Sequence, residues 1–362
     1  MTSGFPQIML TTDAVGGVWQ YTVSLAAGLI DRGYGVHILT LGPTPDAAQR
    51  RGVPAAARLT SLDAPVEWMA ASPAELADVA GRIAHVAEAA GADLLQLHSA
   101  SLAPPAPPCP VIAMQHSCLA TWWRAVRGDA PPKDFEWRIE AHAAGLRRAD
   151  LVTAPSSAFA QMTAEAYDLP RRPVTVHNGR APLGVDELPP GDFVLTVGRL
   201  WDDSKNVAVL DAAARHLTVP VLAAGPLSGP NGETRRFDHL SCLGRCEESA
   251  IADLLSARPV FASTAVYEPF GLAVLEAAQA GCALVLSDIP VFRELWDGAA
   301  LFAPPGDAAA FRAAIDGLFA DAQRRRELGA AARLRSRQFT PGRMVAGMMD
   351  VYGRVTAERA AA

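Results

Sequence analysis

The chain has 362 residues and a formal net charge of −6; half of the residues are hydrophobic and 19% are charged. This composition is typical of a well-buried globular protein and excludes a general nucleic-acid binder, because neutralising phosphates needs a basic face. The five cysteines suggest no disulfide framework, and the sequence shows neither a secretory signal nor an apolar run that could span a membrane, so we expect a cytoplasmic protein.

The first half of the chain alternates short apolar runs with longer amphipathic ones. Strands are predicted at 7–12 and 34–42, with a helix at 18–33 between them. A second helix is predicted at 72–91, where Ser72 begins a capping box. Further buried strands lie in "ADLLQLHS", "CPVIAMQHS" and "ADLVTAPS". This alternation predicts a parallel sheet with helices on both faces.

The alternation pauses in a stretch rich in Pro and Gly, residues 178–192, and then resumes. The fold class expected is therefore α/β, with two doubly wound Rossmann-like domains, 1–185 and 190–338. A helix at about 341–362 follows them. Because ligands bind beyond the carboxyl ends of parallel strands, we expect the functional residues there, in a cleft between the two sheets.

Two strand ends in the first half carry candidate residues. Gly16 and Gly17 separate a strand from a helix, so backbone N–H groups could approach a phosphate, although a tight turn explains the pair equally well. His116 lies just beyond a predicted strand, and His98 occupies a similar place one strand earlier. A lone His is more often structural, so the choice between these two stays open.

The second half opens with "TVGRLWDDSKN", which places two cations after its first strand. Arg199 and Lys205 could converge on one diphosphate, because Arg is a bidentate phosphate donor and Lys a mobile point charge. The alternative is that both are solvated loop charges beside Asp202 and Asp203.

The stretch "VYEPFGLAVLEAAQAG" predicts a helix that starts near 269–271. Backbone N–H groups of Phe270, Gly271 and Leu272 would then lie at its positive end, where an anion can bind.

Two glutamates bracket this helix start. The spacing would let Glu268 accept hydrogen bonds from a sugar and Glu276 from a ribose, with phosphates on the amides between them. The alternative is that Glu268 stabilises the helix dipole and Glu276 is simply exposed.

These segments resemble those of the family 4 glycosyltransferases of the GT-B fold. The matching pieces are "GGVWQYT", "QHS", "VHNG", "VGRLWDDSKN", "EPFGLAVLEAAQAGCALVLSD" and "APPGD", in family order and over nearly the whole chain. The resemblance implies a retaining, metal-independent transferase with two Rossmann-like domains that face each other across a cleft. It also implies that the last helix, at about 341–362, crosses back and joins the first domain, the acceptor side. It implies catalytic roles for His116, Arg199, Lys205 and Glu268. It implies donor contacts for Gly16, Gly17, Arg199, Lys205, Glu268, Phe270, Gly271, Leu272 and Glu276.

The expected reaction moves a hexose from a donor such as UDP- or GDP-hexose to a glycan, lipid-linked or small-molecule acceptor, as in polysaccharide biosynthesis. Neither a metal nor a further cofactor is expected, because Arg199, Lys205 and helix amides would stabilise the leaving diphosphate. In front-face retaining transfer, which the family implies, the donor phosphate takes the acceptor proton. No enzyme nucleophile is then required, and Glu268 is not assigned as one.

The acceptor is expected to contact the first half of the chain. Trp122 and Trp123 could stack on a sugar or lie at a lipid interface, and basic residues of 133–148 suggest a weak peripheral membrane contact. Core packing of the tryptophans explains the same pattern.

Three other functions compete with the transferase. An epimerase or a phosphorylase could use the same two-domain scaffold, and a non-catalytic subunit could bind nucleotide sugars. A dehydrogenase is disfavoured, since neither half has a glycine-rich dinucleotide fingerprint.

Overall fold

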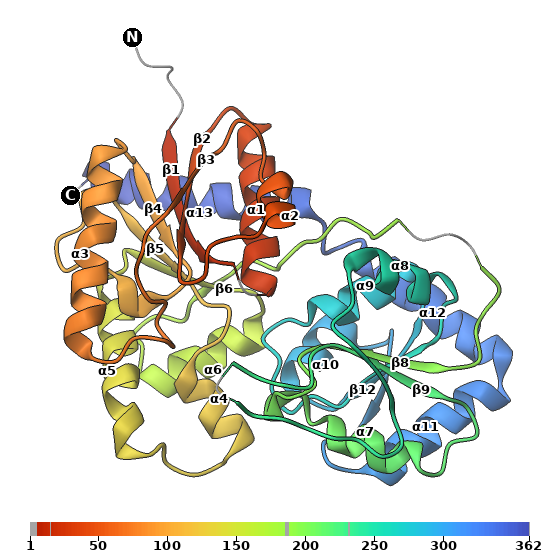
Figure 1. The fold of residues 1–362 in the computed structure, drawn as a ribbon. Coiled ribbons are helices and arrows are strands. Elements are labelled where there is room, and N and C mark those ends of the chain that lie inside the picture. Colours follow the sequence, from red (N-terminus) through yellow and green to blue (C-terminus); the bar gives the residue numbers. More distant parts are fainter. Residues whose placement is uncertain (1–5, 15, 185–187, 231, 362) are drawn as a thin grey trace. The chain divides into compact units, whose positions relative to one another are not determined.

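The chain folds into two compact units, each built on its own parallel sheet (Figure 1). The computed structural model describes residues 6–14, 16–184, 188–230 and 232–361. Unit 1 comprises residues 1–124, 129–179 and 341–362, and unit 2 comprises residues 125–128 and 180–340. The domain limits expected at 185 and 190 stay a prediction, because residues 185–187 of the expected linker lie outside the described residues.

Unit 1 contains a seven-stranded sheet with the order β3-β2-β1-β4-β5-β6-β7, in which every pairing is parallel. Its strands are β1 Gln7–Asp13, β2 Gly35–Leu41, β3 Arg58–Ser61, β4 Leu94–Leu97, β5 Val111–Met114, β6 Leu151–Ala154 and β7 Val174–Thr175. The chain reverses its direction of winding between β1 and β4, which is the switch point of a doubly wound sheet.

Helices cover both faces of this sheet. They are α1 Gly17–Ile30, α2 Ala47–Gly52, α3 Pro73–Ala89, α4 Leu119–Val126, α5 Lys133–Arg148, α6 Ser157–Tyr167, α13 Pro341–Ala361 and the short 3₁₀ helix η1 Ala100–Leu102. Ile8 and Leu10 of β1 pack towards α1 and α13, whereas Met9 packs towards α3 (Figure 1). Because successive side chains of a strand alternate between faces and both faces are covered, the three successive residues from Ile8 to Leu10 are all apolar.

The N-terminus of α3 departs from the predicted capping box. The Ser72 hydroxyl accepts a hydrogen bond from the Glu75 amide, as expected. The Glu75 carboxylate, however, accepts from the backbone N–H of Ala71 at 2.6 Å, one residue before the expected partner. The helix start is therefore correct, but only one half of the reciprocal pair forms.

Unit 2 repeats the architecture with a six-stranded parallel sheet of order β10-β9-β8-β11-β12-β13. Its strands are β8 Val194–Val197, β9 Val221–Ala224, β10 Ser241–Gly244, β11 Val260–Ser263, β12 Ala283–Ser287 and β13 Leu301–Ala303. Its helices are α7 Val207–Ala214, α8 Glu248–Ser256, α9 Leu272–Ala280, α10 Pro290–Trp296, α11 Ala308–Ala320, α12 Ala322–Ser336 and the 3₁₀ helix η2 Asp203–Lys205. Helices α7 and α11 cover one face, and α9 and α12 the other (Figure 1).

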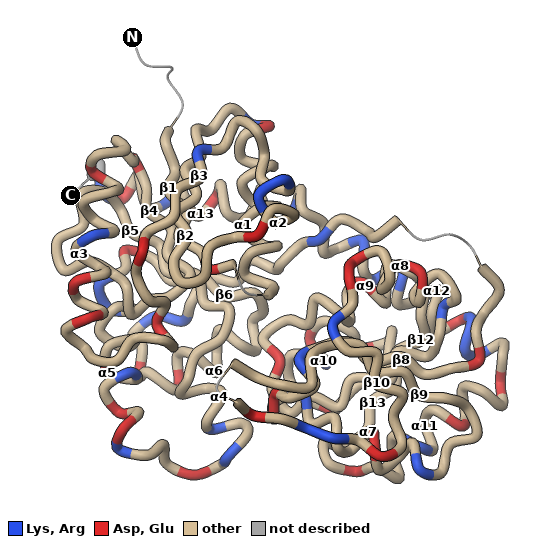
Figure 2. Tube along the Cα trace, in the orientation of Figure 1, with Lys and Arg blue, Asp and Glu red and all other residues tan. Residues whose placement is uncertain are grey.

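Charged residues avoid the sheet interiors. In the described strands the charged residues are Asp13, at the end of β1, and Arg58, at the start of β3, and Figure 2 shows most charges on helices and loops. The two parallel sheets and their winding confirm the predicted α/β fold class. Within the described part of the chain, no helix has both the length and the apolar character needed to cross a membrane.

Candidate functional site

The predicted residues of unit 2 gather at the switch point of its sheet. Strands β8 and β11 are neighbours there, although β9 and β10 lie between them in sequence. The loop after β8 carries the two predicted cations, and the loop after β11 leads into α9. Two segments that are about 60 residues apart in the chain are thus brought to one edge, where open α/β sheets bind ligands.

A network of hydrogen bonds fixes Lys205 beside Glu268. The backbone N–H of Val266 donates to the Ser204 carbonyl at 2.9 Å, and the Thr264 hydroxyl donates to the Lys205 carbonyl at 3.1 Å. Lys205 Nζ then donates to Glu268 Oε2 at 2.5 Å, with the side chains 22% and 17% exposed. The predicted phosphate cation and the predicted sugar carboxylate therefore form one half-buried ion pair.

Arg199 is anchored by an acidic neighbour. Its Nη2 lies 2.8 Å from Asp202 Oδ2, and its guanidinium lies 5.8 Å from the ring centroid of Trp201. Burial acts to raise the pKa of Asp202, but Arg199, hydrogen bonds from Ser204 and the charge of Lys205 outweigh it, so the pKa is lowered. Asp202 is therefore an ionised group that interacts with both predicted cations. The alternative of fully solvated loop charges fits Arg199, which is 57% exposed, only in part.

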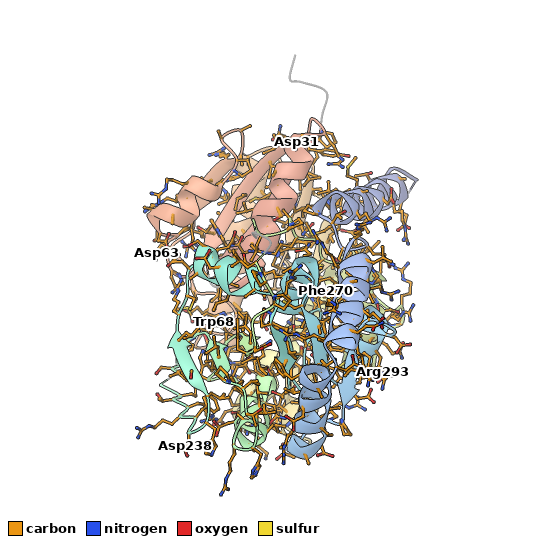
Figure 3. All side chains as sticks on the ribbon, turned by 90° about the vertical axis from the view of Figure 1, so that its right-hand side faces the viewer. Asp31, Asp63, Trp68, Asp238, Phe270 and Arg293 are labelled. Carbon is orange, nitrogen blue, oxygen red and sulfur yellow. The ribbon has the colours of Figure 1, made fainter. Side chains whose placement is uncertain are left out.

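Helix α9 starts at Leu272, just after the range predicted for its start. Its N-cap is Gly271, with φ 90° and ψ 66°, and no side chain caps it. Helix geometry leaves the amides of Leu272, Ala273 and Val274 without intrahelical acceptors. These amides lie two residues later in the sequence than the predicted amides of Phe270, Gly271 and Leu272, and only that of Leu272 belongs to both sets. The Phe270 ring, labelled in Figure 3, is buried. It packs edge-on against the Phe339 ring, with the ring centroids 5.5 Å apart.

Glu276 has a partner that the sequence did not indicate. Its Oε1 forms an ion pair with Nε of Arg180, and both side chains are almost buried, at 13% and 12% exposed. Arg180 also pairs with the exposed Glu248. Burial raises the pKa of Glu276, Arg180 opposes this without cancelling it, and Glu248 adds to the rise. Arg180 therefore offsets part of the cost of burying Glu276, and the contact of Glu276 with a ribose stays a prediction.

The backbone around Arg180 is itself fixed within unit 2. Its N–H donates to the Phe339 carbonyl at 3.3 Å, and Gln279 Nε2 donates to its carbonyl at 2.8 Å. Sequence reasoning placed this residue in a linker and missed it. The available signal was a lone Arg next to the "VHNG" segment, which gave no hint of a partner 96 positions away.

In unit 1, the two competing histidines are direct neighbours. His98 Nδ1 lies 2.7 Å from His116 Nε2, and the rings stack with centroids 4.8 Å apart. The Tyr21 ring meets both edge-on. Burial lowers the pKa of His116 to about 3, and burial followed by the charge of His116 lowers that of His98 well below its usual value. Both rings are neutral at physiological pH, and the structure brings the alternatives together instead of choosing one.

The glycine pair lies at the switch point of the unit 1 sheet. Gly16 has φ 77° and caps α1, which begins at Gly17 without a side-chain cap. A Cβ at Gly16 would meet nothing within 4 Å, so this helix start is open. Trp19, two residues after the pair, is bulky but buried in the core.

The tryptophans proposed for acceptor binding lie on α4. The rings of Trp122 and Trp123 meet edge-on, with their centroids 5.9 Å apart. Trp123 Nε1 donates a hydrogen bond to Asp129 Oδ1 at 2.9 Å. Both are partly buried, and their acceptor role stays a prediction. Trp68, elsewhere in unit 1, is the more exposed aromatic at 46% (Figure 3).

The sequence also showed no sign of a half-buried carboxylate, Glu67, in the loop before α3. Glu67 accepts hydrogen bonds from Ser99 and from His142 Nδ1, the latter at 3.2 Å. Burial acts to raise the pKa of Glu67, but the charge of His142 and these hydrogen bonds lower it to about 2. Arg138 donates to the carbonyls of Glu67 and Ala70, at 2.7 and 2.6 Å. Arg138 thus fixes a loop and is not part of a free basic face.

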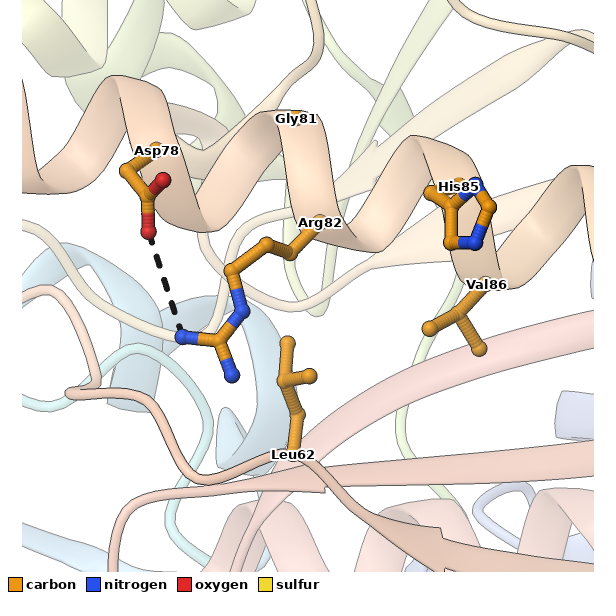
Figure 4. A pocket seen from close by; sticks show the side chains of 6 residues that line it. All are labelled: Leu62, Asp78, Gly81, Arg82, His85 and Val86. Atoms are coloured by element: carbon orange, nitrogen blue, oxygen red, sulfur yellow. Dashed lines mark ion pairs between the residues drawn. The ribbon is translucent and has the colours of Figure 1, made fainter.

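A hollow along α3 has no part in these arrangements. Its lining residues are Leu62, Asp78, Gly81, Arg82, His85 and Val86 (Figure 4). The ion pair within it, between Arg82 and Asp78, is 3.9 Å long and exposed. Such a pair adds little stability and defines no ligand.

Comparison with known families agrees with the geometry of both units. The model of Glycosyltransferase Family 4 matches residues 15–181, and that of Glycosyl transferases group 1 matches residues 189–335. Each unit has an uncapped helix start at the switch point of its sheet, and unit 2 adds two cations, which suits the binding of an anionic ligand. The chain belongs to the family 4 glycosyltransferases, a family of enzymes.

Individual relatives are more distant. The chain is 32% identical over 206 residues to the phosphatidyl-myo-inositol mannosyltransferase of Mycolicibacterium smegmatis, a match covering 53% of each chain. The match thus spans about half the length of that relative. Sucrose-phosphate synthase of Thermosynechococcus elongatus superposes with a TM-score of 0.78 at 20% identity, over 98% of this chain and 100% of that one. Anabaena HepE, solved with UDP-glucose, gives 0.74 at 16% identity, over 96% and 99%. These two structures support the GT-B fold.

Proposed function

We propose that the chain is a retaining hexosyltransferase that uses a nucleoside-diphosphate hexose as donor and a glycan, lipid-linked or small-molecule acceptor. The observation that carries the proposal is the Lys205–Glu268 pair beside the open start of α9. This region of unit 2 brings together a cation, the uncapped amides of a helix start and a carboxylate that can accept a hydrogen bond from a sugar hydroxyl. The solved complexes of HepE with UDP and with UDP-glucose support a uridine donor as the first to test.

Each group keeps hydrogen-bonding capacity for the donor. Lys205 Nζ has three N–H donors and spends one on Glu268, so two remain for phosphate oxygens. Arg199 directs Nη2 at Asp202 and has further N–H groups for the diphosphate. The amides at the start of α9 add the positive end of the helix dipole. Together they would stabilise the charge that develops on the leaving diphosphate.

The bonds that break and form in the proposed reaction follow from where the charge develops. The anomeric C–O bond to the diphosphate breaks, the acceptor oxygen forms the new bond on the same face, and its proton passes to a phosphate oxygen. Glu268 accepts a hydrogen bond from a hexose hydroxyl and Glu276 one from the ribose. By the family pattern, His116 hydrogen-bonds the transferred hexose, and Gly16 and Gly17 leave room for the donor. Trp122 and Trp123 contact the acceptor, and a weak peripheral membrane contact accompanies a lipid-linked one.

A donor panel tests the proposal. Purified protein would be incubated with UDP-, GDP- and ADP-hexoses, with and without EDTA, and nucleotide release would be measured. We expect release from at least one donor, undiminished by EDTA, and proton NMR should show that the product keeps the donor's anomeric configuration. Inversion would contradict the retaining mechanism.

The same panel separates the competing functions. Transfer to free inorganic phosphate would indicate a phosphorylase, and a changed sugar in the recovered nucleotide sugar would indicate an epimerase. Binding without release in any condition would favour a non-catalytic subunit.

A further inference from the structure

Four side chains of unit 1 form a continuous hydrogen-bonded chain that ends at His116. The Tyr352 hydroxyl of α13 donates to Gln96 Oε1 at 2.6 Å, and Gln96 Nε2 lies 3.2 Å from His98 Nε2. His98 Nδ1 then lies 2.7 Å from His116 Nε2. Gln96 is fully buried on β4 and Tyr352 is 3% exposed, so water does not compete for the first link.

The chemistry of the four groups decides which atom donates in each of these hydrogen bonds. An amide nitrogen can only donate, so Gln96 Nε2 makes His98 Nε2 an acceptor. A neutral imidazole has one N–H, which places the proton of His98 on Nδ1. That N–H donates to His116 Nε2, which must therefore carry no proton. The single proton of His116 is left on Nδ1.

If the direction of these hydrogen bonds were reversed, the proton of the Tyr352 hydroxyl would be buried without an acceptor. If the Gln96 amide were turned over, its nitrogen would donate to the Tyr352 oxygen, and the hydroxyl proton would need another partner. Among the described residues, Gln96 is the hydrogen-bond partner of this hydroxyl. The Tyr21 hydroxyl also lies near the Gln96 side chain, but it forms no hydrogen bond with it that meets the geometry of the Tyr352 bond. An unmade hydrogen bond at a buried site costs about 1–3 kcal/mol. Tyr352 thus fixes the amide, and the amide fixes both imidazoles.

We propose that Tyr352, Gln96 and His98 are positioning residues that hold His116 as its Nδ1–H tautomer and present that proton to the ligand. His116 is partly exposed, and within the described ranges of the chain no hydrogen bond is formed by its Nδ1 atom, which leaves that atom available. The functional consequence rests on the proposed role of His116 at the transferred hexose. The tautomer itself follows from unit 1 alone.

Nitrogen NMR of the histidine-labelled full-length protein tests the tautomer directly. The chain has eight histidines, and the signals of His116 and His98 can be assigned by their loss in His116→Asn and His98→Asn. We expect the Nδ1–H pattern for both rings at neutral pH. An Nε2–H pattern for His116 in the wild-type protein would overturn the proposal, whatever the activity.

Tyr352→Phe tests the far end of the chain without touching either imidazole. It frees the Gln96 amide to turn over, so we expect a mixture of His116 tautomers. We expect kcat to fall about tenfold, part of the ~10²–10³ that one positioned hydrogen-bond donor contributes to a transition state, with the donor KM unchanged. Tyr34→Phe is the matched control: it removes a hydroxyl that lies near Tyr352 and the same apolar cluster but takes no part in these hydrogen bonds. If Tyr352→Phe leaves both the His116 tautomer and kcat unchanged, Tyr352 does not position His116 and the proposed relay of hydrogen bonds is refuted.

The two proposals fail in distinguishable ways. If His116→Ala keeps full activity, the assigned role of His116 is wrong, while the NMR spectrum still decides the relay. If the tautomer is Nε2–H while His116→Ala is inactive, the relay is wrong and the assigned role stands.

Discussion

Arg180 provides the opposite charge that the buried carboxylate of Glu276 needs. The two side chains are about equally buried, and the Arg180 backbone is held by Phe339 and Gln279. Removing one partner of such a pair leaves the other charge buried and unpaired, which costs more than the pair itself contributes.

We therefore predict that Arg180→Ala lowers the free energy of unfolding by about 3–5 kcal/mol. Urea denaturation at neutral pH measures this change, with the exposed Arg171→Ala as control. A loss in Arg180→Ala no larger than in the control would show that the ion pair does not stabilise the fold.

The raised pKa of Glu276 also predicts how donor binding depends on pH. A ribose hydroxyl donates to the ionised carboxylate, so affinity should fall as acid protonates Glu276. Because the folded-state pKa is raised, the stability due to this group is complete below the ordinary pKa and is lost as pH rises through the folded value. Donor binding and folding thus favour opposite protonation states of Glu276.

Calorimetric titration with the active donor across a pH series checks this dependence. The acidic midpoint should move to higher pH in Arg180→Ala, because Arg180 is the group that lowers the pKa of Glu276. A midpoint that moves to lower pH, or an affinity that rises in acid, would contradict the role of Glu276.

Helix α9 is bounded by glycines at both ends, and only its first end carries the proposed donor site. Gly271 has φ 90° at the N-cap and Gly281 has φ 85° at the C-cap. Alanine in this region of backbone space is strained at either end. The two positions therefore form a matched pair that separates backbone strain from ligand binding.

Gly271→Ala and Gly281→Ala should each lower the free energy of unfolding by about 1–2 kcal/mol, measured by urea denaturation. Only Gly271→Ala should also weaken donor binding, since its Cβ lies 3.2 Å from Phe292 and the strain distorts the amides that follow. Equal donor affinity in the two variants would place the diphosphate elsewhere.

Several elements were predictable because their signals are local. The run at 7–12, the Ser72 cap and the glycine-bounded α9 each depend on neighbouring residues. Arg180 with Glu276, and Glu67 with His142, join positions 96 and 75 residues apart, and nothing in local sequence indicates such pairs. The Glu75 carboxylate shows the same limit at short range, because the turn before α3 decides which amide it meets.

The last helix belongs to the first unit, which makes unit 1 discontinuous in sequence. Val345, Met348 and Val351 of α13 pack with Leu25 of α1 in one buried cluster. Gly28 permits this close approach, because a Cβ there would lie 2.4 Å from Val345 Cγ2. The predicted helix at about 341–362 is confirmed, and the fold shows that it completes the core of unit 1.

Met348→Ala should lower the stability of unit 1 by about 2–5 kcal/mol, because Met348 is fully buried. Calorimetric unfolding would measure the loss, with the exposed Arg354→Ala as control. Donor affinity at low temperature should stay unchanged, since the proposed phosphate and ribose contacts lie in unit 2 and unit 1 stays folded at that temperature. A stability equal to that of the control would contradict the role of α13 in the core.

The chain as a whole is proposed to act through the charge of Lys205 beside Glu268. Single-turnover release of nucleoside diphosphate from the active donor measures that contribution most directly. We predict that Lys205→Ala slows release by about 10², as expected for lost stabilisation of the leaving group, while Lys133→Ala on α5 matches the wild type. Wild-type release by a folded Lys205→Ala protein would contradict the account.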